Sequence, residues 1–489
     1  MAVLPDQLRW LAEQHPDAVA YEVAGVGALT ATAWHRDSSR LARGLVARGI
    51  RPGARVALLL PQTAGLRFVV AYAAIHKAGG VAVPVNVRLS PPEVARLLEH
   101  CGARLVVVSP GLRHLAGDEL PVLDTETDWE ASLHPDGSDL QVPRGSDDLA
   151  ELLYTSGTTG APKGVEIEHG NAALRMLARP TWTGAAWLHA SPLSTFAGLT
   201  FVYQPMRMGM RTLQMPAFDV GDWLDLVERQ RPPAAFLVPA MVELLLASGQ
   251  LAGRDLSSLA VVSVGSAPAA PATLLRLQDA LPEAAITNSY SMTEAGTTYC
   301  MLPKGELRKR PGSVGKPLPP AEIRVVDEQS EEVPRGVTGE IVIKPAGRPR
   351  RYHRDPEATA ALYRGQWLRT GDLGHLDDDG YLFVTGRAKD VIIRGGNNVH
   401  ASDVEAVLYE HPAVREAAVA AIPHAVLGED VAAYVVLTDG AATTPEELIA
   451  FARGRLADYK VPRLVELRRE LPRNATGKVQ KRDLHPRTP

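Results

Sequence analysis

The sequence predicts an α/β protein with a large N-terminal domain of parallel-type sheets covered by helices, a small β-subdomain and a small α+β C-terminal domain. The first observation is length, because 489 residues exceed what a single hydrophobic core supports. The second is an alternation of short apolar runs with helical patterns, which is typical of β-α units. The third is a change near residues 312–316 to closely spaced strands and turns, which indicates antiparallel pairing.

The N-terminal elements follow this alternation in chain order. The first group comprises a strand at 56–60, a helix at 65–78, a strand at 81–85, a helix at 91–101 and strands at 105–108 and 149–154. The second group comprises strands at 187–191, 234–238, 259–264 and 285–288, with helical stretches between them. The β-subdomain contributes strands at 323–326, 339–344 and 380–387.

A charged break at Ala388-Lys389-Asp390 marks the expected boundary, which gives domains of residues 1–387 and 388–489. About 100 residues is a common size for a domain. Two capping boxes predict helices there: Ser402 with Glu405 begins one through Glu410, and Thr444 with Glu447 begins one to about Ala457. The strands of this domain are expected at 391–394, 417–422 and 431–437.

Composition excludes several classes of protein. A formal net charge of −4 disfavours a broad surface for nucleic acid or membrane. Cys101 and Cys300 lie far apart, so we expect buried free thiols in a reducing compartment. The N-terminus lacks the long apolar core of a signal peptide, and the apolar runs are too short or too interrupted to span a bilayer. We expect a soluble cytoplasmic protein with neither nucleic acid nor membrane as a partner.

A loop after the strand at 149–154 carries the clearest chemical signal. It combines closely spaced glycines with hydroxyl side chains and a lysine, which favours binding of a phosphate group. The residues concerned are Thr155, Ser156, Gly157, Thr158, Thr159, Gly160 and Lys163. The loop is not the usual P-loop, because Gly164 rather than Ser or Thr follows the lysine. A flexible surface loop is the alternative, since Gly, Ser and Thr clusters are typical of loops.

This loop resembles the signature loop of the adenylate-forming superfamily, which includes acyl-CoA synthetases, adenylation domains of peptide synthetases and beetle luciferases. Four further segments resemble motifs of that superfamily in the same order along the chain. They are Tyr290-Ser291-Met292-Thr293-Glu294, Trp367-Leu368-Arg369-Thr370-Gly371-Asp372, Gly395-Gly396 and Pro472-Arg473-Asn474-Ala475-Thr476-Gly477-Lys478. The resemblance covers nearly the whole chain and implies that the small C-terminal domain is mobile.

The resemblance implies a site for ATP and Mg²⁺. In it Tyr290 packs against adenine, Thr293 bonds the α-phosphate and Glu294 holds the metal, as suits a hard cation. Asp372 binds the ribose hydroxyls, and Arg387 reaches ribose or phosphate. The family-like stretch at Ser266 and Ala267 adds further nucleotide contacts, and Lys163 steadies the β- and γ-phosphates.

The resemblance also assigns three features of the C-terminal domain. Lys478 is the catalytic lysine, which bonds the substrate carboxylate and the α-phosphate during adenylation. Lys389 occupies the hinge position, and Gly395 and Gly396 line the tunnel for the pantetheine arm of coenzyme A. Taken alone, a lysine such as Lys389 reads as a solvated surface residue.

We expect the acid to lie against small and apolar residues of the N-terminal domain. The pocket residues are Thr195, Phe196, Gly198, Gly265, Ser291 and Met292. Many relatives carry an aromatic-His pair where this chain has Ser194-Thr195, so the gate of the pocket is altered. No carboxylate follows Thr195 to hold an ammonium group, and burying an unpaired ammonium is costly. The acid is therefore expected to lack a free α-amino group.

These features predict an ATP-dependent ligase that joins a small-molecule carboxylic acid to coenzyme A through an acyl-adenylate. Four alternatives stay open: an enzyme that loads the acyl group onto a carrier protein, a luciferase-like oxidase, a member that performs one half-reaction, and a nucleotide-binding regulator without catalysis. Neither the identity of the acid nor its size follows from the sequence.

Overall fold

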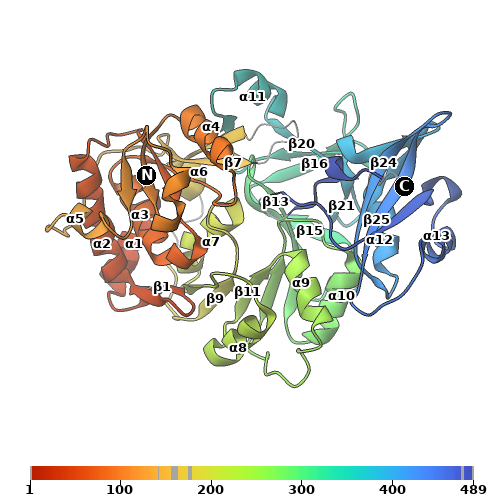
Figure 1. Ribbon diagram of the computed structural model, residues 1–489, viewed down its shortest axis with the longest axis horizontal. Coiled ribbons are helices and arrows are strands. Elements are labelled where there is room, and N and C mark those ends of the chain that lie inside the picture. Colours follow the sequence, from red (N-terminus) through yellow and green to blue (C-terminus); the bar gives the residue numbers. More distant parts are fainter. Residues whose placement is uncertain (1–2, 141, 156–162, 174–178, 475–477, 487–489) are drawn as a thin grey trace.

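The computed structural model describes residues 3–140, 142–155, 163–173, 179–474 and 478–486 (Figure 1). A large N-terminal domain is followed by a small C-terminal domain, shown in blue, which packs beside its β-rich end (Figure 1). Contacts between the two run from α12 (Ala401–Tyr409) to α10 (Pro271–Ala280) and β21 (Leu382–Arg387). The predicted fold class is confirmed.

The first sheet has seven strands in the order β18-β8-β7-β4-β3-β5-β6. Its centre is parallel, because β3 (Arg55–Leu59) runs alongside β4 (Val81–Pro84) and β5 (Ala103–Val108) in the same direction. Parallel neighbours need crossover connections. Here α3 (Gly65–Lys77) and α4 (Pro91–Cys101) supply them, so the expected β-α alternation is confirmed.

One edge of this sheet departs from that pattern. β7 (Leu149–Thr155) pairs in parallel with β4, but β8 (Lys163–Glu168) returns antiparallel to β7, with Thr155 opposite Lys163. β18 (Arg351–Tyr352) then pairs antiparallel with β8, although it comes much later in the chain. The glycine-rich segment therefore connects the two arms of a hairpin, whereas a P-loop connects a strand to a helix.

The second sheet has 14 strands, of which the middle section is parallel. That section contains β10 (Arg211–Gln214), β9 (Ala186–His189), β11 (Ala234–Leu237), β12 (Val261–Val264) and β13 (Ala285–Met292). Antiparallel pairing begins where β13 meets β14 (Gly296–Met301), which is earlier than the change expected near residue 312. It continues through β15 (Ser313–Pro317), β21, β20 (Trp367–Leu376), β17 (Gly339–Lys344) and β16 (Glu322–Val326).

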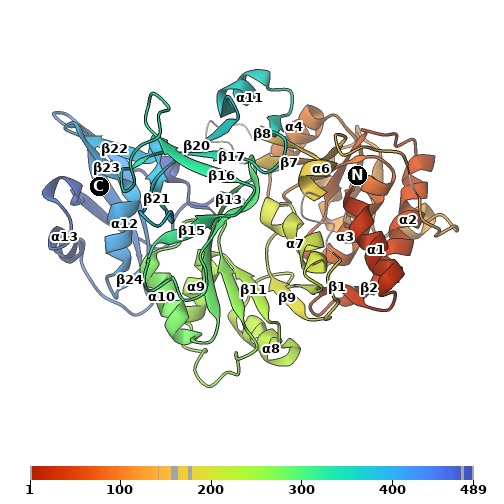
Figure 2. The same ribbon diagram turned by 180° about the vertical axis from the view of Figure 1, so that it is seen from behind.

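The remaining helices of the N-terminal domain lie around these two sheets, and its remaining strands belong to the sheets (Figures 1 and 2). The helices are α1 (Leu4–Gln14), α2 (Ala31–Ala47), α5 (Trp129–Ser132), α6 (His169–Ala173), α7 (Phe196–Arg207), α8 (Val220–Gln230), α9 (Pro239–Ala247) and α11 (Pro356–Leu362). The strands are β1 (Val19–Val23), β2 (Gly27–Thr30), β6 (Val122–Asp124) and β19 (Tyr363–Arg364).

The C-terminal domain has a five-stranded sheet that carries two α-helices. The strands are β22 (Val391–Arg394), β23 (Asn397–His400), β24 (Val414–His424), β25 (Gly428–Leu437) and β26 (Leu464–Arg468). The capping box at Thr444 and Glu447 is confirmed and begins α13 (Pro445–Arg453), which ends earlier than expected.

The capping box at Ser402 and Glu405 is wrong, because α12 begins at Ala401, with His400 as its N-cap. Ser402 donates its hydroxyl to the carbonyl of Thr385, and Glu405 accepts from the backbone N–H of Val419 at 2.8 Å. Both side chains thus bond to neighbouring elements instead of to the helix end.

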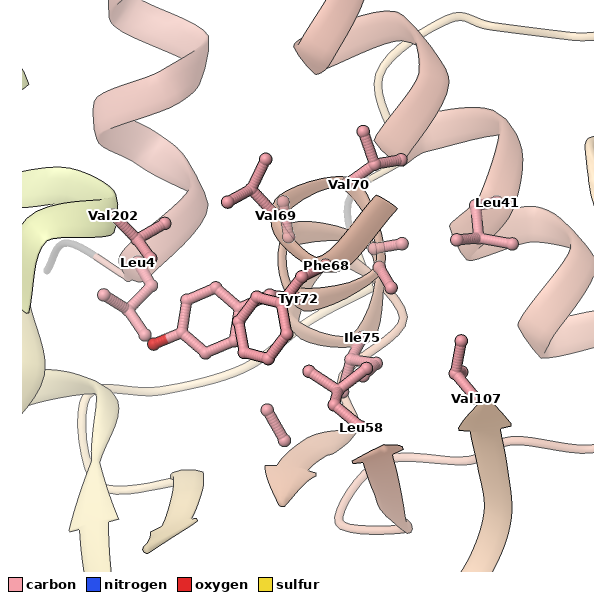
Figure 3. Close-up of a cluster of buried hydrophobic side chains, with 14 of the residues drawn as sticks. Leu4, Leu41, Leu58, Phe68, Val69, Val70, Tyr72, Ile75, Val107 and Val202 are labelled. Carbon is pink, nitrogen blue, oxygen red and sulfur yellow. The ribbon is translucent and has the colours of Figure 1, made fainter. Parts of the chain in front are cut away.

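A buried helix organises the N-terminal core. α3 contacts α1 and α2 on one side and β3 on the other, and Figure 3 shows its side chains between those helices and the strands. Phe68, Val69, Tyr72 and Ile75 are almost completely buried. A helix that is apolar on all faces must be covered on all faces. α3 therefore fixes the first sheet against the helices that cover it.

Both cysteines are free and buried, as expected. Within the described residues, every helix is too short or too polar to cross a membrane.

Candidate active site

The hairpin of β7 and β8 carries the first and the last of the phosphate-loop residues. Thr155 and Lys163 stand opposite each other at the end of the hairpin where the connecting segment begins and ends. Ser156, Gly157, Thr158, Thr159 and Gly160, which the sequence assigns to the nucleotide, lie outside the described residues. The Lys163 ammonium sits 4.8 Å from the ring centroid of Tyr352, a cation–π distance that holds the lysine over the site.

The turn between β13 and β14 carries Thr293 and Glu294. The hydroxyl of Tyr352 donates to Oε1 of Glu294 at 3.0 Å, and Nη1 of Arg350 donates to the carbonyl oxygen of Thr293. Ser291 is exposed, and Met292 packs partly buried against the core of the β-subdomain. The segment around residues 350–352 thus binds the turn that the sequence assigns to the α-phosphate and the metal.

Asp372 gathers the residues assigned to adenosine. Its Oδ2 accepts from the Tyr290 hydroxyl at 2.6 Å, and its Oδ1 accepts from Nε of Arg387 at 2.9 Å. The aspartate is only 6% exposed. Burial and the Asp372 charge raise the pKa of Tyr290 well above its usual value, so its hydroxyl stays a donor. The structure therefore brings together Tyr290, Asp372 and Arg387, which are distant in the sequence.

Lys478 reaches this cluster from the C-terminal domain. Its carbonyl accepts a hydrogen bond from the backbone N–H of Asn474 at 2.9 Å. Lys478 is exposed, yet the surrounding protein and the Arg387 charge lower its pKa, while Glu294 and Asp372 oppose that shift. Lys478 is therefore close enough to interact electrostatically with Arg387, Glu294 and Asp372.

The other C-terminal residues lie elsewhere. Lys389 is exposed on a 3₁₀ turn (Ala388–Asp390) between the domains. The neighbouring protein displaces part of its solvent and so lowers its pKa, while the Asp390 charge opposes the shift. Gly395 and Gly396 form the exposed turn between β22 and β23, with φ of 55° and 84°. Figure 2 shows β22 and β23 well away from β7. The structure thus brings Lys478, and not the two glycines, to the nucleotide residues.

The residues assigned to the acid line the start of α7 and the ends of β12 and β13. Thr195 is the N-cap of α7: its hydroxyl accepts from the Gly198 N–H at 3.2 Å and donates to the Pro192 carbonyl at 2.7 Å. Phe196 begins the helix and lies 5.2 Å from the guanidinium of Arg350. A Cβ on Gly198 would overlap the Pro192 carbonyl, so this position accepts only glycine without a shift of the helix.

Gly265 and its neighbours continue the same region from β12. A Cβ on Gly265 would lie 2.5 Å from Oγ of Ser289, so a larger residue would displace that side chain. Ser266 has a φ of 68°, in the left-handed region that residues other than glycine rarely adopt. Ala267 follows, half-buried. A strained residue in such a place is compatible with a site whose backbone geometry is needed for binding.

Sequence reasoning missed Arg350 and Tyr352, which contact Thr293, Glu294 and Lys163. They lie among several arginines that read as a charged surface, since most arginines are exposed. Only the antiparallel pairing of β18 with β8, with Tyr352 opposite Val165, turns the two side chains toward the site. A hydrophobic Tyr between charged residues was the one available signal.

Comparison with known proteins gives matches over nearly the whole chain. The family model described as "AMP-binding enzyme" matches residues 8–353, and the one described as "AMP-binding enzyme C-terminal domain" matches residues 403–478. A feruloyl-CoA synthase from Amycolatopsis sp is 36% identical over 486 residues, which are 97% of each chain. A fatty acid–[acyl-carrier-protein] ligase from Streptomyces coeruleorubidus is 33% identical, over 94% of this chain and 91% of that protein.

Solved structures agree with these matches. The o-succinylbenzoate CoA synthetase of Bacillus subtilis, in complex with its acyl-adenylate intermediate, superposes with a TM-score of 0.88 at 29% identity. The alignment covers 99% of this chain and 98% of that one. Both domains are therefore matched together, in one arrangement.

Proposed function

Since the chain belongs to the AMP-binding enzyme family, we propose that it is an ATP-dependent carboxylic acid–CoA ligase that works through an acyl-adenylate. The observation that carries this proposal is that Lys478, from the other domain, lies within range of the charges of Arg387, Glu294 and Asp372. A site that only stored a nucleotide would have no need of a lysine supplied by a second domain.

In the first half-reaction a carboxylate oxygen of the acid attacks the α-phosphorus of ATP. The bond to the oxygen that bridges to the β-phosphate breaks, and pyrophosphate leaves with its electron pair. Negative charge builds between the carboxylate and the phosphate, and the Lys478 ammonium and the Thr293 hydroxyl stabilise it. Asp372 and Arg387 orient the nucleoside so that this attack is in line.

Mg²⁺ belongs to this proposal. Glu294 would hold it, and the ion would offset charge on the phosphates. In proteins Mg²⁺ commonly binds through one or two carboxylates together with substrate phosphates. A single glutamate is in keeping with this, and the described residues contain no group of three His, Cys, Asp or Glu side chains that could hold a metal unaided.

In the second half-reaction the thiol of coenzyme A attacks the carbonyl carbon of the adenylate. The bond between the acyl carbon and the phosphate oxygen breaks, and AMP leaves. Because Gly395 and Gly396 lie away from the nucleotide residues, the C-terminal domain must rotate about Lys389 to deliver their turn to the site. Such rotation lets one site serve two geometries.

Acid-dependent exchange of pyrophosphate into ATP tests the proposal. We expect exchange with at least one acid of a panel of aryl, medium-chain, long-chain and polycyclic acids, and AMP release when coenzyme A is added. α-Amino acids should support none, because the described pocket residues offer no carboxylate for an ammonium. A protein that binds ATP but shows neither exchange nor thioester formation from a supplied adenylate would be a regulator instead.

A carrier protein as the acyl acceptor is the second candidate. The observation in its favour is the acyl-carrier-protein ligase relative, which is nearly as similar as the feruloyl-CoA synthase. Parallel assays with coenzyme A and with a phosphopantetheinylated carrier protein separate the two. Exchange without transfer to either thiol would identify a member that performs only the first half-reaction.

A further inference from the structure

Arg350 is a buried cation that contacts both the turn assigned to the α-phosphate and metal and the helix assigned to the acid. It is 6% exposed, although it precedes a two-residue strand at the edge of a sheet. Its Nη1 donates to the carbonyl oxygen of Thr293, and its guanidinium lies 5.2 Å from the ring of Phe196. It therefore joins the turn of Thr293 and Glu294 to the first residue of the helix that borders the acid.

The strand pairing explains why Arg350 faces inward. β18 alternates, so that Arg351 and His353 bind Glu166 on one side, at 3.1 and 2.8 Å. Arg350 and Tyr352 are turned to the other side, where Tyr352 donates to Glu294. The register of β18 on β8 thus aims both side chains at the same turn.

The charge of Arg350 also acts on the strand before the phosphate loop. Glu151 lies on β7 and is 4% exposed, and it accepts a hydrogen bond from Tyr72. Burial raises the pKa of Glu151, while the Tyr72 hydroxyl and the Arg350 charge lower it. A buried guanidinium is costly unless it is paired and hydrogen-bonded. Here the Thr293 carbonyl accepts a hydrogen bond from it, and the buried Glu151 carboxylate interacts with its charge.

We propose that Arg350 is a positioning residue for adenylation, one that fixes the Thr293–Glu294 turn relative to Phe196 so that the acid carboxylate meets the α-phosphate. The inference rests on the proposed function. It assigns no contact between Arg350 and substrate: the guanidinium acts through a backbone carbonyl, an aromatic ring and a buried carboxylate. Geometry of this kind matters because a displacement of about 1 Å can cost roughly 100-fold in rate.

Three variants test it: Arg350→Met, Arg350→Lys and, as a matched control, Arg351→Met. Arg351 is the adjacent arginine, has a 60% exposed side chain and faces Glu166 instead of the site. For each variant we would measure thermal stability, kcat and KM of pyrophosphate exchange, and thioester formation from preformed acyl-adenylate. That last reaction needs no attack on the α-phosphate.

For Arg350→Met we expect kcat of exchange to fall by about 100-fold. The KM values for acid and ATP should change by only about threefold, and thioester formation from adenylate by less than about tenfold. Arg350→Lys should recover about tenfold of the lost kcat, because it keeps the charge and one donor. Arg351→Met should match the wild type.

Other results would overturn the inference. A folded Arg350→Met protein with normal kcat, equal losses in exchange and in thioester formation, or a lower melting temperature as its only change would mean a purely structural arginine. If Arg350→Met does not fold, the Arg350→Lys protein decides alone, since a structural role predicts normal exchange per folded molecule. If the wild type shows no pyrophosphate exchange, the proposed function and the inference fail together. If the wild type is active and Arg350→Met exchanges at the same rate, only the inference fails.

Discussion

Asp372 illustrates how single residues prepare the site for a nucleotide. A carboxylate that is 6% exposed is costly unless it is hydrogen-bonded, and Tyr290 and Arg387 both donate to it. These donors keep the carboxylate oriented. Ribose hydroxyls would add to them or replace one, so a rigid acceptor is present before binding. The interaction with Arg387 also ties the ribose side of the site to the start of the interdomain turn.

Lys478→Ala should lose pyrophosphate exchange by about 100- to 1,000-fold, because one charged donor to a developing anion is worth that much. Thioester formation from preformed adenylate should fall by less than about tenfold, since the proposed rotation withdraws Lys478 from the site. Lys344→Ala is the matched control, as Lys344 forms an exposed ion pair with Glu322 at 2.6 Å. Equal loss in both half-reactions would contradict the role given to Lys478.

The buried Lys77 should make the stability of the protein depend on pH. Its side chain is 0% exposed and burial lowers its pKa to about 7, so the folded protein holds this proton less tightly than the unfolded chain does. Between pH 7 and the ordinary lysine value the unfolded chain binds more protons, so stability rises with pH. Lys77→Met should flatten that rise by a few kcal/mol, at about 1.4 kcal/mol per pKa unit. Urea unfolding at pH 7, 8 and 9 measures it, and an unchanged slope would contradict it.

At the scale of elements, the site is assembled from the ends of strands and the start of one helix. β7, β13 and β20 supply Thr155, Tyr290 and Asp372, while α7 begins at Phe196 next to them. The carboxyl ends of parallel strands are where α/β proteins place ligands. Strand β18 adds Tyr352 through its pairing with β8. β7, β13, β18 and α7 end or begin near these residues, whereas Asp372 lies in the middle of β20. The geometry of the site therefore depends on the ends of these elements and on their close approaches.

Gly198→Ala tests one such approach. A Cβ there would overlap the Pro192 carbonyl, so α7 would have to shift, which should cost about 1–3 kcal/mol. Gly221→Ala is the matched control, because Gly221 is also in the first turn of a helix and its Cβ would meet only side chains, Asp219 at 3.3 Å and Gln250 at 3.9 Å. We expect that control to change stability by no more than about 0.5 kcal/mol. Urea unfolding of both variants decides, and equal behaviour would contradict the predicted overlap.

The sequence alone predicts features that depend on residues close together in the chain, and it does not predict those that depend on tertiary contacts. The β-α order of the first sheet and the cap at Thr444 depend on local patterns and are confirmed. Arg350 could not be predicted, because its role depends on a two-residue strand that pairs with β8. The cap at Ser402 failed because a tertiary acceptor, the Thr385 carbonyl, competes for the hydroxyl. The roles of the motif residues, such as Ser266 and Lys389, stay predictions.

At the scale of the whole molecule, the C-terminal domain turns one of two functional features toward the nucleotide residues: Lys478, and not the turn of Gly395 and Gly396. Lys478 feels the charges of Glu294 and Asp372, while Gly395 and Gly396 are exposed on a distant turn. Lys478 and the turn of Gly395 and Gly396 belong to the same small domain and lie apart in it. Both therefore cannot occupy the site at once. Under the proposed roles of these residues, we expect adenylation in this arrangement and attack by the thiol in another.

Acid should destabilise the N-terminal domain. Burial lowers the pKa of His76 well below its usual value and those of His169 and His189 to about 3. Between pH 6.5 and 3 the unfolded chain binds more protons, so stability falls as pH falls through this window. The three histidines together should cost about 4 kcal/mol between pH 7 and pH 5.5.

Tryptophan fluorescence measures this loss in the N-terminal domain alone, because all 7 tryptophans precede residue 388. The urea midpoint should drop between pH 7 and pH 5.5, and His189→Phe, which keeps a ring against Phe201, should reduce the drop by about one third. A midpoint that does not change with pH would show that these histidines are protonated in the folded protein.

The late arrival of β18 has a consequence for synthesis of the chain. Glu166 on β8 and Arg351 on β18 are 185 positions apart, so the ribosome makes β8 well before its edge partner. At 5–20 residues per second the interval is about 10–40 s. During it β8 is an unpaired sheet edge, the kind of surface on which aggregation begins. When β18 is made, Arg351 meets Glu166 and Glu168 on the edge strand β8, and opposite charge favours the correct pairing.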